Sequence, residues 1–384
     1  MKKVLLATTA LIAASAFAAP AKAELEVTVG GFTSFQAGFF DNDAANSSDR
    51  DFQSEAQIAI RADGTADNGL QYGAKVLMNA STSDTANADE TGVYLAGSWG
   101  RVELGDDDGA SELVVFAPTV GIGQINGSYD DYIPVNAQSH LLNDRGDHNF
   151  TALDSDDSTK ITYYTPKFAG FQAGVSYAPE YQGFNIFGLA GVAGSAGENV
   201  ALAEDLTLAS DIVEVGLGYE GSFSGLDVKV GGNFVRGSAT DADIDPGVGV
   251  VTIEDIRAWS LGAQIGWNGF RFGAGYTDNS DSLQEDGFAS DDVTSWNVGA
   301  TYENGPWGVG ISYLDTDYDV NGVATTLFTT GVGGDSTVLA LGATYTVAPG
   351  LTTGADLAFY ERDANGTVDD QDGFVAVVDV TAAF

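Results

Sequence analysis

From Glu24 to its end, the chain is built from runs of about ten residues in which apolar and polar side chains alternate. In the run 51–63, Phe52 and Ile58 share one face of an extended strand, whereas Gln57 falls on the other. Successive side chains of a strand point to opposite faces. The pattern therefore predicts β-strands with one apolar and one polar face, and hence an all-β fold.

Sixteen runs of this kind can be counted in the sequence. We expect strands near 25–40, 51–63, 69–80, 91–99, 101–107, 159–166, 168–178, 211–223, 226–237, 256–267, 270–278, 293–303, 307–317, 336–347, 351–361 and 373–384. An even number of antiparallel strands lets the two ends of a barrel meet on the same rim, as in the single-chain barrels of bacterial outer membranes. The sequence thus predicts a 16-stranded antiparallel transmembrane β-barrel.

Short and long connections alternate along the chain. The short ones carry residues typical of tight turns, at 67–69 (DNG), 99–100 (WG), 224–225 (SG), 268–269 (NG), 304–306 (NGP) and 349–350 (PG). The long ones are rich in Asp, Asn, Ser and Gly, and include 41–50, 238–255, 279–292, 318–335 and 362–372. We expect the short turns at the periplasmic rim and the long loops at the extracellular rim.

A soluble β-sandwich would show the same alternation, so the positions of the tryptophans help to separate the two folds. By parity all five tryptophans fall on the apolar face, with Trp99, Trp267 and Trp307 beside short turns and Trp259 and Trp296 near the opposite strand ends. In a sandwich that face is the core, where tryptophan would favour strand centres. In a barrel it faces lipid, and indoles gather at the two membrane interfaces. The barrel is therefore favoured.

The first 23 residues have the composition of a secretory signal peptide. Lys2 and Lys3 precede an apolar stretch, and 21–23 (AKA) is a small-x-small cleavage site. We expect residues 1–23 to be removed and 24–384 to form the barrel. No later segment has the roughly 20 uninterrupted apolar residues of a membrane-spanning helix. An exported chain of this kind is periplasmic, secreted or, as the strands favour, an outer-membrane protein.

The chain is strongly acidic, with 55 acidic residues against 15 basic ones. Three basic residues, Lys2, Lys3 and Lys22, fall in the expected signal peptide, so the mature chain has a net charge of 12 − 55 = −43. This charge repels nucleic-acid phosphates and attracts cations, which argues against DNA or RNA as a partner. Because cysteine is absent, the chain has no disulfide, thiolate metal site or cysteine nucleophile.

Two passages resemble the Gram-negative general-diffusion porins of the alphaproteobacterial, Rhodobacter-type family. Residues 65–75 (TADNGLQYGAK) are similar to their first periplasmic turn, and 97–112 (GSWGRVELGDDDGASE) to the passage from their fourth strand into the third loop. Weaker similarity extends over the mature chain to the terminal Phe384. The resemblance implies a sixteen-stranded homotrimeric barrel that passes small hydrophilic solutes and ions, a third loop folded into the lumen, and calcium bound among loop acids.

The longest connection, 108–158, is expected to be the constriction loop of the pore. Free loops of about fifty residues are uncommon without a function. This one has an apolar start, with Leu113, Val114, Val115 and Phe116 in succession. Such side chains gain nothing in water but are buried when packed against the inner barrel wall. An external cap or a contact between protomers is the alternative interpretation.

A loop in the lumen should set acids against bases across the pore. By parity three bases, Arg61, Lys75 and Arg101, lie on the water-facing side of nearby strands. The candidate acids are Glu103, Asp106, Asp107, Asp108, Glu112, Asp130 and Asp131. Opposed charges orient water and dipolar solutes and penalise apolar ones, and the net negative charge predicts a weak preference for cations. The alternative is that these acids are solvated loop residues.

Calcium is the one cofactor that the sequence suggests, and no organic cofactor is expected. Calcium prefers six to eight oxygen ligands, several of which Asp106, Asp108 and Glu112 could supply. A second candidate set is Asp130 and Asp131 with Asn126. Calcium could also bridge the acidic outer loops to lipopolysaccharide phosphates, because loops this acidic would otherwise be repelled by that surface.

The predicted function is a weakly cation-preferring general-diffusion channel of the outer membrane, not an enzyme. One rival is a substrate-selective channel in which Tyr94, Tyr129 and Tyr132 form a binding track. Another is a barrel hydrolase that uses His140 or His148, although no G-x-S-x-G motif accompanies these histidines. A third is a secreted soluble β protein.

Overall fold

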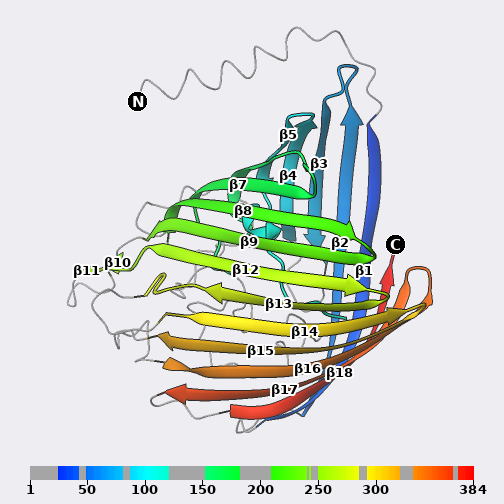
Figure 1. The fold of residues 1–384 in the computed structure, drawn as a ribbon, viewed down its shortest axis with the longest axis vertical. Coiled ribbons are helices and arrows are strands. Elements are labelled where there is room, and N and C mark those ends of the chain that lie inside the picture. The colour runs from blue at the N-terminus through cyan, green and yellow to red at the C-terminus, as the bar shows by residue number, and fades with distance from the viewer. Residues whose placement is uncertain are drawn as a thin grey trace.

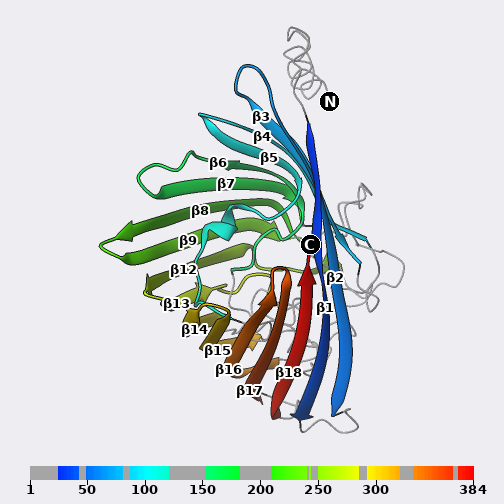
Figure 2. The same cartoon turned by 90° about the vertical axis from the view of Figure 1, so that its right-hand side faces the viewer.

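Sixteen antiparallel strands form one closed barrel in the described part of the chain (Figures 1 and 2). This computed structural model describes residues 25–42, 49–80, 87–120, 152–181, 209–239, 242–243, 250–284, 292–320, 332–365 and 371–384. The predicted signal peptide, 1–23, lies outside the described residues. The predicted all-β, sixteen-stranded antiparallel barrel is confirmed.

The barrel strands follow one another around the ring in chain order, each paired with its neighbours in sequence. They are β1 (Glu26–Asn42), β2 (Arg50–Thr65), β3 (Gln71–Asn79), β4 (Asn87–Gly97), β5 (Gly100–Asp106), β6 (Thr159–Tyr164), β7 (Phe171–Glu180), β8 (Ala209–Phe223), β9 (Leu226–Ala239), β12 (Ile256–Trp267), β13 (Phe270–Asp278), β14 (Thr294–Asn304), β15 (Trp307–Val320), β16 (Val332–Ala348), β17 (Leu351–Asn365) and β18 (Gln371–Ala383). A small sheet of β10 (Ala242–Asp243) and β11 (Val250–Val251) and the 3₁₀ helix η2 (Ala110–Leu113) complete the described elements. None of the described helices is long and apolar enough to cross a membrane.

Strands β15 to β18 reach further into the predicted loops than the sequence pattern indicated. β15 continues to Val320 and β16 begins at Val332, so the pairing includes Asp319 with Gly333. Likewise β17 continues to Asn365. The expected loops 318–335 and 362–372 are therefore too long at both ends. Backbone pairing can continue past the apolar band of a barrel, where a strand no longer needs an apolar face, and Asp and Gly residues there resemble a loop in composition.

The ring closes where β1 meets β18. Gly31 and Phe384 exchange two backbone hydrogen bonds of 3.0 Å, and Phe32 lies opposite Ala383. The last residue of the chain is thus part of the seam. Closure leaves no open sheet edge, so every strand of the barrel has a hydrogen-bonded neighbour on both sides.

Two of the short connections show why the sequence predicts tight turns. Asn268 and Gly269 have φ angles of 48° and 85°, and Ser224 and Gly225 have φ angles of 53° and 84°. Two successive positive φ angles define a type I′ turn, whose twist matches that of the flanking strands and which favours Asn-Gly. These turns connect β12 to β13 and β8 to β9 at the rim where β1 begins and β18 ends.

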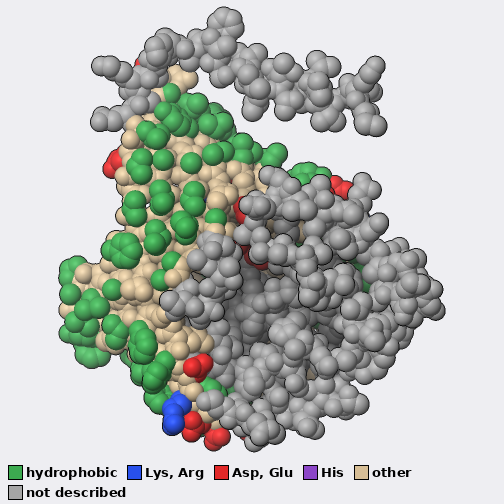
Figure 3. Space-filling view, turned by 180° about the vertical axis from the view of Figure 1, so that it is seen from behind, with side chains coloured by type: hydrophobic (Ala, Val, Ile, Leu, Met, Phe, Trp, Pro, Cys, Tyr) green, Lys and Arg blue, Asp and Glu red, His purple; other side chains and the backbone are tan. Residues whose placement is uncertain are grey.

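The outer wall is apolar, as the alternation predicts. Along β1, Val27, Val29 and Phe35 are more than half exposed. All five tryptophans also face outwards, with exposed fractions between 38% and 59%. Figure 3 shows hydrophobic side chains spread over this wall, with the visible charged side chains confined to its margins. Such a surface is suited to lipid and would be costly in water.

The inner wall carries two apolar clusters that are buried. In β16, Val338 and Ala340 are 1% exposed and point inwards, whereas Leu339 and Leu341 face out and are 38% and 39% exposed. The first cluster comprises Ala117, Leu314, Val338, Ala340, Ala358, Tyr360, Val375 and Val377. The second comprises Ala152, Ala178, Ala209, Ile212, Val235, Ile256 and Ala258. These parts of the inner wall are packed, whereas charged side chains face water on the wall of β2 to β5.

Candidate functional site

The described parts of the predicted constriction loop, 108–120 and 152–158, lie inside the barrel (Figure 2). The outgoing limb runs along the inner wall formed by β8, β9 and β12. Wall glycines make this close approach possible: a Cβ atom at Gly231 would overlap the carbonyl oxygen of Leu113, and one at Gly262 would overlap that of Val115. Backbone therefore lies directly against backbone where the loop crosses the wall.

Side chains of the wall bind the backbone of both limbs. The amide N–H of Ala117 donates to Asn297 Oδ1 at 2.8 Å, and Gln264 donates to the carbonyl of Phe116 at 2.7 Å. On the returning limb, the N–H of Leu153 donates to Asn279 Oδ1 at 2.7 Å. Amide side chains that face inwards thus satisfy loop backbone groups which have left water.

Glu214 on β8 contacts both limbs at once, and the sequence analysis did not identify it. Its side chain is fully buried, with no exposed surface. One carboxylate oxygen accepts hydrogen bonds from Ser111, and the other accepts from Ser155. The only signal in the sequence is an acidic residue at an inward position of an otherwise apolar run, 212–217.

A buried lysine joins the two limbs closer to the strands. Lys160 on β6 is 4% exposed, and its ammonium group donates to the backbone carbonyls of Asp107 and Asp156. Asp107 directly precedes the outgoing limb and Asp156 lies near the end of the returning one. Lys160 therefore holds together the two ends of the loop where they meet the strands, near Asp107 and Asp156, which we call the loop neck. The sequence analysis did not identify Lys160, because its partners are backbone atoms.

A recess of about 350 Å³ lies between this neck and the wall of β2 to β5. Its charged lining residues are Arg61, Asp63, Lys75, Arg101, Glu103, Asp107, Asp108 and Glu112. Seven of these eight were predicted from the sequence as pore residues, and Asp63 is the addition. The parity of the strands and the position of the loop thus bring the predicted bases and acids together in one water-accessible space.

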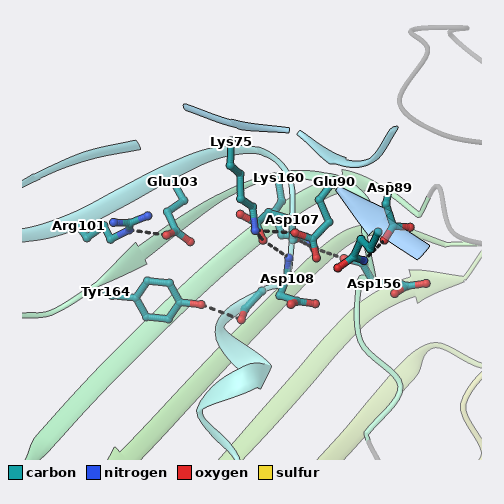
Figure 4. Close-up of polar contacts among 12 residues, drawn as sticks. Lys75, Asp89, Glu90, Arg101, Glu103, Asp107, Asp108, Asp156, Lys160 and Tyr164 are labelled. Carbon is teal, nitrogen blue, oxygen red and sulfur yellow. Dashed lines mark hydrogen bonds and ion pairs between the residues drawn. The ribbon is translucent and has the colours of Figure 1, made fainter. Parts of the chain in front are cut away.

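The basic side chains of the recess differ in their partners (Figure 4). Lys75 forms ion pairs with Glu90 and Asp107, at 2.6 Å to each. Arg101 pairs with Glu103 and stacks on the ring of Tyr94, with 3.8 Å from its guanidinium carbon to the ring centroid. Arg61 is exposed to the recess and, within the described residues, makes no ion pair.

A β-bulge brings two further acids, Asp89 and Glu90, to the inner wall. Leu77 pairs with Glu90, but Met78 pairs with Ala88, so the register shifts by one residue at Asp89. A bulge re-aims side chains that strict alternation would place on opposite faces. Asp89 accepts hydrogen bonds from Asn79 at 2.9 Å and from Gln57 at 3.4 Å. Asp89 departs from simple parity, whereas Glu90 has the parity of Gly92 and Tyr94 but lies before the predicted strand, which began at residue 91.

Some predicted residues are not brought into this arrangement. Asp106 is 6% exposed, does not line the recess, and its Oδ1 atom has no hydrogen-bond partner among the described residues. Asp130 and Asp131 lie outside the described residues, as do Asn126, Tyr129, Tyr132, His140 and His148.

The predicted calcium ligands are not assembled as a group. Among the described residues, the carboxylates whose oxygen atoms lie within 4.8 Å of one another are Glu90, Asp107 and Asp108. Asp108 was predicted as a ligand, but Asp106 and Glu112 do not belong to this group. The Lys75 ammonium lies 2.6 Å from two of its three members and offsets part of their charge. As arranged here, these residues fit a lysine better than they fit a calcium ion.

The end of the returning limb is a concentration of negative charge. Burial raises the pKa of Asp157 to about 7, with a further contribution from the neighbouring charges of Asp156, Asp108 and Asp106. A carboxyl group with this pKa exchanges its proton near neutral pH, so the charge at the loop neck depends on pH.

A family model described as Gram-negative porin matches residues 7–365 of the chain. The chain belongs to the Gram-negative porin family. This porin is 25% identical to the porin of Rhodobacter capsulatus, over 68% of this chain and 86% of that protein. It is also 24% identical to an uncharacterized protein of Rickettsia bellii, over 94% of this chain and 93% of the other.

Solved porin structures share the fold of this porin. The anion-selective porin from Comamonas acidovorans has a TM-score of 0.64 at 18% identity, covering 94% of this chain and 100% of that one. The trimer form of OmpT, an outer membrane protein of Vibrio cholerae, has a TM-score of 0.61 at 15% identity, covering 94% and 99%. The predicted porin family is confirmed. Family and fold together indicate an outer-membrane channel rather than an enzyme.

Proposed function

We propose that this porin is a general-diffusion channel with a weak preference for cations, which passes small hydrophilic solutes and ions. The observation that carries the proposal is the charge of the recess: three bases, Arg61, Lys75 and Arg101, line it together with five acids, a balance of 3 − 5 = −2. A negative lining beside a water path raises the local concentration of cations. Opposed charges also favour polar permeants over apolar ones.

Tyr94 supports a general pore over a substrate-selective one. Its hydroxyl donates to Asp63 at 2.5 Å, and its ring is covered by Arg101. A ring engaged in this way offers little open surface to a sugar or an aromatic solute. The other two tyrosines of the rival binding track, Tyr129 and Tyr132, lie outside the described residues.

Planar-bilayer recordings test the proposal. In a potassium chloride gradient, we expect a reversal potential of the sign that indicates cation preference, and a conductance that rises in proportion to salt concentration. A series of uncharged sugars of increasing size should reduce the conductance by size alone. A preference for anions would contradict the proposed selectivity. Saturable block by one class of sugar or peptide would favour the substrate-selective channel.

We further propose that the porin is a homotrimer whose outer wall contacts lipid and lipopolysaccharide. The exposed apolar side chains around the barrel support contact with lipid. A similar solved protein, OmpT of Vibrio cholerae, is described in a trimer form. Light scattering of the detergent-solubilised protein should give three times the mass of one chain after subtraction of the detergent. A mass of one chain would contradict the trimer.

Removal of residues 1–23 belongs to the same proposal, because a chain bound for the outer membrane must first be exported. The composition of this segment supports it. Amino-terminal sequencing of protein purified from outer membranes should begin at Glu24. A sequence that begins at Met1 would show that the segment is retained.

A further inference from the structure

We propose that Glu214 is a positioning residue, which holds both limbs of the constriction loop against the barrel wall and thereby sets the open width of the pore. The inference rests on the proposed function, because it treats 108–158 as the constriction. It adds a buried residue of the wall that does not itself line the charged recess, and whose side chain controls conductance without touching the permeant.

The two oxygens of Glu214 divide the two limbs between them. Oε2 accepts hydrogen bonds from the backbone N–H of Ser111 at 3.1 Å and from its hydroxyl at 2.8 Å. Oε1 accepts from the backbone N–H of Ser155 at 3.0 Å and also from its hydroxyl. Each limb offers one backbone and one hydroxyl donor, although the single hydroxyl proton of Ser111 is shared between Glu214 and Asp154 Oδ2, which lies 2.9 Å from Ser111 Oγ. A single side chain therefore joins the start of the loop, the end of the loop and strand β8.

An ionised carboxylate suits this position better than other side chains do. Four donors converge on it, and both of its oxygens only accept. A glutamine has one accepting oxygen and one donating nitrogen, so it would leave one serine N–H facing another donor. Ser111 and Ser155 are 2% and 0% exposed. Water does not replace a hydrogen bond that is lost there, and a buried unpaired N–H is costly.

The neighbouring backbone is shaped around the carboxylate. A Cβ atom at Gly109 would overlap Glu214 Oε2, and one at Gly216 would overlap the carbonyl oxygen of Ala110. The N–H of Ala110 also donates to Ser176 Oγ on β7 at 2.5 Å. The outgoing limb thus passes directly over Glu214. Glu214 is therefore one of the wall groups that hold the limb in this close approach, and the one that also binds the returning limb.

The consequence for transport follows from where the loop would move. Outside the limbs is the packed wall of β7 to β9, so a released limb has room only towards the lumen. A loop that leaves the wall part of the time produces brief, partly closed states in a single-channel record. Loss of the Glu214 contacts should therefore increase current noise in the open channel and lower its mean conductance.

The test compares Glu214→Gln with Glu220→Gln in single-channel recordings of the full-length porin. Glu220 lies on the same strand and the same face, but pairs with Lys167 at 3.4 Å and Lys229 at 3.1 Å rather than with the described limbs of the loop. Both changes remove one negative charge. We expect Glu214→Gln channels to spend on the order of tenfold more time in partly closed states, since about one hydrogen bond to each buried donor is at stake. Glu220→Gln channels should have wild-type noise.

A second variant protects the test against loss of folding. The double change Ser111→Ala and Ser155→Ala removes one donor from each limb and leaves the barrel wall intact. This double variant should also increase the current noise, but by less than Glu214→Gln does. If both Glu214→Gln and the serine variant have wild-type conductance and noise, the proposal is wrong. If Glu214→Gln does not fold, the serine variant decides alone by the same criterion.

The outcome is separable from that of the proposed function. Ion preference is measured from the reversal potential, whereas the role of Glu214 is measured from noise and partial closures. An anion-preferring wild-type channel would contradict the proposed selectivity and leave the loop test valid. Wild-type noise in the Glu214 and serine variants would overturn only the role of Glu214.

Discussion

The ammonium nitrogen of Lys75 lies 2.6 Å from a carboxylate oxygen of Asp107, so a side chain of β3 is joined directly to the residue that precedes the constriction loop. The same nitrogen is 2.6 Å from Glu90. One base is therefore shared by two acids at the point where the loop leaves the barrel wall. These ion pairs couple the field inside the pore to the position of the loop, and the predictions below concern this field and the contacts that hold the loop.

Replacing Lys75 by glutamate should increase cation selectivity. The change puts a third carboxylate beside Glu90 and Asp107 and removes the base that balances them. We expect the permeability ratio of potassium to chloride to rise roughly twofold or more, because the local field becomes more negative. Lys167→Glu is a control with the same change of charge, since Lys167 is exposed outside the recess. An unaltered reversal potential in Lys75→Glu would show that this side chain does not face the water path.

Removing the ammonium group should create sensitivity to calcium. In Lys75→Gln, the carboxylates of Glu90, Asp107 and Asp108 lose the base that pairs with two of them, while their oxygens remain close together. Hard divalent cations bind clustered carboxylates. We expect millimolar calcium chloride to reduce the single-channel conductance of Lys75→Gln more than that of the wild type. Equal effects on the two channels would mean that the lysine does not compete with divalent cations.

Adding one methyl group to the wall should displace the loop. A Cβ atom at Gly262 would overlap the carbonyl oxygen of Val115, so Gly262→Ala should cost about 1–3 kcal/mol and change the conductance. Gly266→Ala is matched to it on the same strand, where the new atom would meet Asp227 at an ordinary 3.4 Å. Thermal unfolding in detergent and single-channel conductance should both separate the two variants. Identical behaviour would show that the loop can move without consequence.

The stability of the loop neck should decrease as the pH rises. The pKa of Asp157 is raised to about 7, chiefly by burial, whereas an unfolded chain gives aspartate a value of about 3.9. The folded state therefore binds this proton more tightly, and the stability it contributes is present at low pH and is lost as the pH rises towards about 7. Asp157→Asn cannot titrate. Between pH 5 and pH 8, the wild type should lose a few degrees more of its melting temperature than Asp157→Asn does. An equal loss would contradict the raised pKa.

The number of strands and their outward faces could be predicted because lipid imposes a strict rule on each residue. Phe52 must face outwards and Gln57 inwards wherever the strand crosses the apolar band. The rule ends with that band, which is why pairing at Asp319 and Gly333 could not be predicted from composition. Runs that are apolar on both faces carried a further signal: Val375 and Val377 face inwards and are buried at 1% and 2%. Such runs indicate a part of the inner wall that packs against other side chains instead of facing water.

The parts of the site that depend on strand alternation and on the position of the long loop could be predicted from the sequence. Lys75, Arg101 and Asp107 follow from parity and from the start of the long loop. Glu90 was missed because the predicted strand began at residue 91, whereas Asp89 was missed because a bulge breaks the alternation there. Glu214 was missed because its contact with Ser111 spans 103 residues, and nothing in the local sequence of either residue indicates the other.

The seam between β1 and β18 has a consequence for how the molecule is made. The hydroxyl of Thr381 donates to that of Ser34 at 2.9 Å across 347 residues of chain, so the two ends can join only after everything between them has been synthesised. Contacts this distant form slowly, because a large entropy must be lost before they can form. Until they do, the unfinished sheet has two bare edges that readily pair with other chains. Assembly is thus a competition between ring closure and aggregation, and the hydrogen bonds between Gly31 and Phe384 contribute to closure.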